Sequence, residues 1–278
     1  MTAGLLESKK DASMQTSLVK VLIGALAAIV FIIALPYIQL GVVYSYWTPD
    51  KESVDRTKCT CSCWDTIFKG SYSSGTVSGY KHVYFNITPQ TFKIWALTLV
   101  VIVVTYETVK HLVQLAISNS LRLSMFILFA SVVYPHYYSW WSYFNAWNDD
   151  FYQQWFHQAF FSLTELVSTV LVVLHCDKSR TVNPRLLLVI VDIAVLHIAA
   201  SGFDQFVSNV IMGKGKWHQV TRDIGFMVPD LLHILLPLFE IWMFGREHGL
   251  TFTQCFQKSD LLMSGAGIAI LWFICMKL

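Results

Sequence analysis

Residues 21–43, VLIGALAAIVFIIALPYIQLGVV, decide the fold class because they run without a single charged side chain. The hydrocarbon core of a bilayer is about 30 Å thick and needs about 20 mostly apolar residues in one helix to cross it. The whole chain agrees in composition, since 55% of its 278 residues are hydrophobic. Only 14% are charged, against about 25% in soluble domains. The sequence therefore predicts an all-α, multi-pass membrane helix bundle.

Six further stretches approach the first one in length and hydropathy, which predicts about seven transmembrane helices. The expected spans are approximately 21–43, 92–115, 121–144, 152–175, 186–208, 223–245 and 261–276. A six-span arrangement stays open if the short last stretch lies in the membrane interface. The first span is longer than the apolar core of a signal peptide, and no small-residue cleavage site follows it, so we interpret it as an uncleaved anchor.

Basic residues and one glycosylation pattern predict the orientation. Lys9, Lys10 and Lys20 precede the first span, and the positive-inside rule then favours a cytosolic N-terminus. This gives a cytosolic tail over 1–19 and a single transmembrane domain over 20–278, with an extracellular or lumenal loop at about 46–91. Asn86 in that loop begins an N-x-T glycosylation pattern. Lysines and an arginine at 214–222 argue for the opposite orientation. An integral protein of the secretory pathway or plasma membrane is expected.

Three cysteines in the same loop form a C-x-C-x-C run, Cys59, Cys61 and Cys63. In an oxidising compartment two of them can form a disulfide, and Cys275 at the outer end of the last span is a candidate partner for the third. A metal site is the alternative for three close thiols, although the sequence offers no evident fourth ligand.

Acidic residues inside the expected spans are the main functional signal. Six of the 18 acidic residues lie there: Glu107, Glu165, Asp192, Asp204, Asp230 and Glu240. Each costs about 2.5–3.5 kcal/mol to insert without a partner. Lysine and arginine stay near the span ends, so we expect these carboxylates to pair with histidines, hydroxyls, protons or a metal ion.

Helical spacing and depth sort these residues into two sets. His197 with Asp204, and His233 with Glu240, are seven residues apart and would lie about 20° apart around an α-helix. With the predicted orientation, the outer set converges on one cavity open to the outside and consists of His136, His157, Glu165, His197, Asp204, Asp230 and His233. A smaller inner set, Glu107, His111 and Glu240, lies near the cytosolic face.

The outer set predicts a candidate metal-dependent enzyme that acts on a lipid. Imidazole and carboxylate are the usual ligands of a divalent metal such as zinc. We assign His157, His197 and His233 as candidate ligands. Glu165, Asp204 and Asp230 are candidate catalytic groups. The alternative for each histidine is a structural hydrogen bond between helices.

Other functions fit the same residues. A proton or metal-cation transporter would use both sets, since histidine titrates near neutral pH. An accessory membrane protein or a receptor is a further alternative. The aromatic stretch 134–160 is typical of an interfacial belt, or it lines a vestibule for a lipid or cationic ligand. Membrane lipids and a small lipid or cation are the expected partners, and the net charge of +2 gives no reason to expect nucleic acid.

Overall fold

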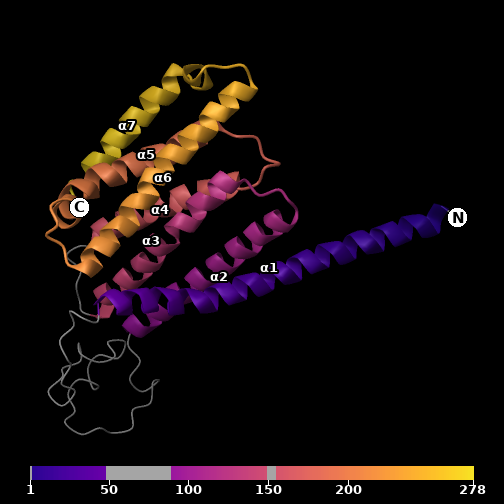
Figure 1. The fold of residues 1–278 in the computed structure, drawn as a ribbon, viewed down its shortest axis with the longest axis horizontal. Coiled ribbons are helices and arrows are strands. Elements are labelled where there is room, and N and C mark those ends of the chain that lie inside the picture. Colours follow the sequence, from indigo (N-terminus) through magenta and orange to yellow (C-terminus); the bar gives the residue numbers. More distant parts are fainter. Residues whose placement is uncertain (1, 48–88, 149–154) are drawn as a thin grey trace, which may run out of the picture.

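The structure, a computed structural model, describes residues 2–47, 89–148 and 155–278 (Figure 1). Within these ranges the side chains are described except at 2–14, 40, 42–47, 90, 145, 148 and 201–204. The described residues form helices and no β-strand, and a single isolated bridge joins Leu121 to Asp177. The predicted all-α helix bundle is confirmed.

Each predicted apolar stretch lies mainly in helical structure, although the first helix begins well before residue 21 and the stretch 186–208 is divided between two helices. The described helices are α1 (Thr2–Trp47), α2 (Pro89–Ile117), α3 (Leu123–Asn148), α4 (Trp155–His175), α5 (Pro184–Ser201), the π-helix η4 (Gly202–Ile211), α6 (Trp217–Glu247), the 3-10 helix η5 (Phe252–Cys255) and α7 (Lys258–Cys275). Five of the described helices, α1, α2, α4, α6 and α7, are long and apolar enough to cross a membrane, and α5 with η4 would make a sixth. The helix α3 is outside this group, because tyrosine and tryptophan fill its second half. The count of seven spans stays a prediction.

The fifth stretch differs from the expected straight span. The helix α5 ends at Ser201, and the chain continues as the π-helix η4 at an angle of 72° to it. Sharp bends in helices occur at Gly/Ser pairs and at π-helical turns, and Ser201-Gly202 is such a pair. The 20° relation that we expected between His197 and Asp204 therefore does not apply, since it holds only within one continuous α-helix.

The bundle is built around pairs of neighbouring helices. The helix α1 packs along α2, and its N-terminal part extends beyond the other helices in Figure 1. The helix α6 packs against α3 and α5, and α5 also contacts α4 and α7. The buried core contains Leu112, Met125, Leu128, Val172, Cys176, Leu187, Ile190 and Ile241. All come from α2 to α6 except Cys176, which directly follows α4. The helices α4, α5 and α6 thus lie close enough to share a site.

Arg122 joins three parts of the bundle at one end. Its guanidinium donates hydrogen bonds to the carbonyl oxygens of His175, at 2.6 Å, and Arg180, at 3.1 Å. Its Nε lies 3.7 Å from Oε2 of Glu240, and the hydroxyl of Ser124 donates to the same carboxylate. Glu240 on α6 therefore has a basic partner, contrary to our expectation that the carboxylates inside the spans would lack one. The reason is that the α2–α3 turn places Arg122 against the side of α6.

Candidate functional site

Three neighbouring helices each contribute one ionisable side chain to a single point. They are Glu165 from α4, His197 from α5 and Asp230 from α6. One ligand atom from each lies within 4.8 Å of the other two. The Nδ1 atom of His197 is 3.4 Å from Oε2 of Glu165 and 3.5 Å from Oδ1 of Asp230. All three side chains are shielded, since His197 is 7% exposed and the carboxylates 15% and 14%.

The hydroxyl of Thr164 assigns the proton of His197 to one ring nitrogen. Its Oγ1 lies 3.0 Å from the carbonyl oxygens of Phe160 and Phe161, to which a helical threonine ordinarily donates. The same oxygen is 2.7 Å from Nε2 of His197 and so accepts a hydrogen bond from that nitrogen. A neutral imidazole carries a proton on one nitrogen only, so Nδ1 presents a lone pair.

That lone pair faces two carboxylates, an arrangement that is electrostatically unfavourable without a cation between them. The cation is either a proton on Nδ1 or a metal ion. Charge-assisted N–H···O bonds are about 2.7–2.9 Å long, which is shorter than the 3.4 and 3.5 Å seen here. Ligand atoms around a tetrahedral zinc ion, each about 2.0–2.2 Å from the metal, lie about 3.3–3.6 Å apart. The spacing of these donors is therefore compatible with a metal ion as well as with a shared proton.

Two more histidines lie beside this group. His136 on α3 and His233 on α6 both interact electrostatically with Glu165, and His233 also interacts with Asp230. Neither belongs to the set of donors within 4.8 Å of one another. The Nε2 atom of His136 is 2.7 Å from the hydroxyl of Thr169. The Nδ1 atom of His233 donates to the carbonyl oxygen of Pro229 at 2.8 Å. The site thus has a central group of three donors and two further histidines beside it.

The ring of Phe161 forms part of the wall of the site. It packs against His197, with ring centroids 5.0 Å apart, and against His157, at 4.8 Å. An aromatic wall lowers the local polarity and so strengthens electrostatic interactions within the site.

His157, a predicted ligand, lies away from the group of three donors. Its Nε2 atom is 3.8 Å from Sγ of Cys275, whose thiol is free in the described part of the chain. Its candidate disulfide partners Cys59, Cys61 and Cys63 lie outside the described residues, so that pairing stays a prediction.

The inner set is not brought together. Glu107 is exposed and pairs with Lys110 at 2.6 Å, His111 is exposed, and Glu240 faces Arg122. Asp192, which we had placed inside a span, accepts a hydrogen bond from Ser264 at 2.6 Å.

Several predicted residues lie outside the described part. Asp204 belongs to the backbone of η4, but its side chain is not described. Asn86, Cys59, Cys61 and Cys63 lie in 48–88, outside the described ranges.

Sequence reasoning missed Thr164, Thr169 and Phe161, which hold the histidines in place. Thr164 directly precedes Glu165, and a threonine in an apolar helix ordinarily bonds back to its own helix. Nothing in its spacing therefore distinguished it from a structural threonine. The carbonyl of Pro229 was missed for the same reason, since a backbone group carries no sequence signal.

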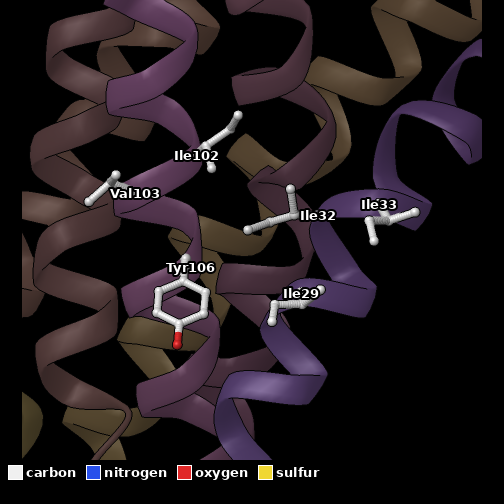
Figure 2. A pocket seen from close by; sticks show the side chains of 6 residues that line it. All are labelled: Ile29, Ile32, Ile33, Ile102, Val103 and Tyr106. Atoms are coloured by element: carbon white, nitrogen blue, oxygen red, sulfur yellow. The ribbon is translucent and has the colours of Figure 1, made fainter.

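A separate hollow between α1 and α2 is apolar. Ile29, Ile32, Ile33, Ile102, Val103 and Tyr106 line it (Figure 2). Five of these six side chains are aliphatic and supply no acid, base or metal ligand, so this hollow offers contact surface rather than chemistry. The group of Glu165, His197 and Asp230 is the stronger candidate for a functional site.

Comparison with known proteins gives one match. Residues 21–278 match a family of unknown function, DUF8801. No curated protein and no solved structure matches the chain.

Proposed function

We propose a function for this chain, which belongs to the family of unknown function DUF8801. It is a multi-pass membrane protein that binds a divalent metal ion, such as zinc, between α4, α5 and α6. With the ion bound, the site would supply an activated water for the hydrolysis of an ester or amide bond of a lipid. In this proposal Glu165, His197 and Asp230 are the ligands, so the two carboxylates that we had first considered catalytic become metal ligands.

The observation that carries the proposal is the direction of Nδ1 of His197. This nitrogen lies 3.4 and 3.5 Å from two carboxylates, and the other ring nitrogen lies 2.7 Å from the hydroxyl of Thr164. A histidine whose second nitrogen is held by a hydrogen bond is typical of metal ligands, because that bond fixes the ring and its tautomer. A structural histidine needs no pair of carboxylates in front of its lone pair.

The number of ligands favours catalysis over a purely structural metal. Structural zinc sites close the coordination sphere with four protein ligands, whereas catalytic sites have three and keep one position open. A zinc ion at such a site lowers the pKa of a bound water to about 7 and polarises a carbonyl group. Among the side chains that the structure describes, which do not include Asp204, the residues Glu165, His197 and Asp230 form a group of three.

A membrane location supports a lipid substrate. Apolar side chains of α4 that face away from the site are strongly exposed: Leu163 at 63%, Leu166 at 45%, Val167 at 51% and Val170 at 51%. A soluble protein rarely exposes a continuous apolar face of this kind, whereas lipid chains cover it readily. Glu165 lies on the same helix but is largely shielded, so the helix separates a lipid-facing side from a polar interior.

Transport of a proton or metal cation is the second candidate. The bend of 72° between α5 and η4 favours it, because discontinuous helices often form the ion sites of transporters. The separation of the inner residues weakens it, since Glu240 is paired with Arg122 and Glu107 with Lys110.

Elemental analysis of the protein purified in detergent tests the proposal. We expect about one equivalent of metal in the wild type, its loss in His197→Ala, and its retention in His175→Ala. His175 is a suitable control because it is buried, 4% exposed, and bonded to a backbone carbonyl of its own helix. A wild type that binds no metal, and that added zinc does not stabilise, would refute the metal site.

Two activity assays then separate the candidates. Release of fatty acid from lipid esters and amides, dependent on the metal, supports the hydrolase. Metal-ion or proton flux into liposomes, abolished by Glu165→Gln and without any hydrolysis, supports the transporter instead. Glycosylation at Asn86 tests the predicted orientation.

A further inference from the structure

His233, next to the proposed metal site, contains a buried nitrogen that no described side chain or backbone group contacts by a hydrogen bond. The residue is 3% exposed, and its Nε2 atom has no hydrogen-bond partner among the described residues. A buried polar atom left unpaired costs about 1–3 kcal/mol, and native proteins rarely retain one without a bound water, an ion or a functional role. Within the described part of the chain this nitrogen is therefore open to a further partner, such as a water molecule.

The protonation of that nitrogen follows from the other side of the ring. Nδ1 lies 2.8 Å from the carbonyl oxygen of Pro229, and a carbonyl only accepts, so Nδ1 carries the proton. In the neutral ring Nε2 then has a lone pair and acts as a hydrogen-bond acceptor. His136 differs in this respect, since its Nε2 already contacts the hydroxyl of Thr169.

The position of His233 suits contact with a water molecule rather than with the metal. It interacts electrostatically with Glu165 and Asp230, so it lies beside the site. It is not part of the group whose donor atoms all lie within 4.8 Å of one another. A buried lone pair beside the ligands, with no partner among the described residues, would be able to accept a hydrogen bond from a water molecule bound at the site.

We propose that His233 is the catalytic base that takes a proton from the attacking water, an inference that rests on the proposed metal-dependent hydrolysis. An O–H bond of the water breaks, its proton moves to Nε2, and the water oxygen forms the new bond to the carbonyl carbon. Nδ1 keeps its bond to Pro229, which helps to stabilise the positive ring. The proton then passes from Nε2 to the leaving oxygen or nitrogen as the ester or amide bond breaks. The balance is one water consumed and one acyl bond cleaved.

Cobalt and acetohydroxamate test this without a known substrate. Cobalt takes the place of zinc and gives a visible spectrum, and acetohydroxamate loses a proton when it chelates a metal. A nearby base that takes this proton strengthens its binding. We expect His233→Ala to bind one equivalent of cobalt like the wild type but to bind acetohydroxamate at least tenfold more weakly. The matched control, His175→Ala, removes a histidine with the same backbone bond and similar burial, and we expect wild-type values.

Other results would overturn the inference. Unchanged acetohydroxamate affinity in His233→Ala makes the histidine structural, and loss of cobalt in that variant alone makes it a ligand. A wild type that binds cobalt but not acetohydroxamate has no open coordination position. That result would support the metal site but reject His233 as the catalytic base. A wild type that binds no cobalt removes both. If His233→Ala does not fold, His233→Gln accepts a hydrogen bond but takes no proton, and the same tenfold loss is expected.

Discussion

Replacing Thr164 with valine removes one hydroxyl and leaves the outline of the side chain almost unchanged. In the structure this hydroxyl oxygen lies 2.7 Å from Nε2 of His197 and holds the ring with Nδ1 toward Glu165 and Asp230. Valine offers no acceptor, so Nε2–H loses its partner and the ring loses the bond that fixes its tautomer. We therefore expect weaker metal binding with all three ligands still present.

Two estimates give the size of the effect. Leaving a buried donor unsatisfied costs about 1–3 kcal/mol. Removing the hydrogen-bond partner of a metal-ligating histidine typically lowers metal affinity by about 10–100-fold, or about 1.4–2.7 kcal/mol. The ranges overlap, so we expect cobalt to bind Thr164→Val about 10–100-fold more weakly than the wild type.

A competition titration against a coloured chelator, with the protein in detergent, measures this affinity. The matched control is Thr169→Val on the same helix, because the Thr169 hydroxyl contacts His136, which is outside the group of three donors. We expect little change in the control. The reasoning is refuted if Thr164→Val binds cobalt like the wild type, or if both variants lose affinity equally.

Three further predictions concern stability and are measured by unfolding in detergent. Removal of metal with EDTA lowers the melting temperature by about 5–10 °C relative to protein with zinc at 100 times its Kd, because zinc binding at that concentration stabilises the fold by about 2.7 kcal/mol. Equal melting curves with and without zinc contradict this prediction. Arg122→Met lowers the free energy of unfolding by about 3 kcal/mol, because it leaves Glu240 without its basic partner. Adding Glu240→Gln recovers part of this loss, and a double variant that is no more stable than Arg122→Met argues against the ion pair. Gly225→Ala lowers the free energy of unfolding by about 1–3 kcal/mol, since the added Cβ would lie 2.5 Å from the Tyr134 ring. Gly267→Ala, whose Cβ would meet nothing within 4 Å, is neutral or stabilising, and equal effects at the two glycines contradict the close packing of α3 on α6.

The seven-residue spacing shows where sequence reasoning about the site succeeds and where it fails. It placed His233 and Glu240 on one face of a helix, but the two residues have different partners: His233 lies by Glu165 and Asp230, and Glu240 by Arg122. Residues on one helix face lie at different positions along the helix axis, and the packing of neighbouring helices decides which side chain each of them contacts. The spacing of His197 and Asp204 failed for another reason, because the helix bends between them.

The sequence could predict that Glu165, His197 and Asp230 converge, because all three belonged to the expected outer set. Their exact grouping was not, because His157 seemed an equally good ligand by residue type and depth. In the structure His157 lies against Cys275 instead. Rotation of α4 about its axis decides this, and that rotation depends on how α4 packs against α3 and α5.

The sequence by itself determined the all-α class and the positions of the apolar helices, because the length and hydropathy of each stretch are local properties of the chain. It also showed that carboxylates and histidines lie within those helices while lysine and arginine stay near their ends. The tertiary structure alone decided which of these residues share a site and which nitrogen of His197 faces the carboxylates. It also decided that Nε2 of His233 has no hydrogen-bond partner within the described ranges. These features depend on distances between atoms far apart in the sequence, and such distances exist only once the helices have packed together.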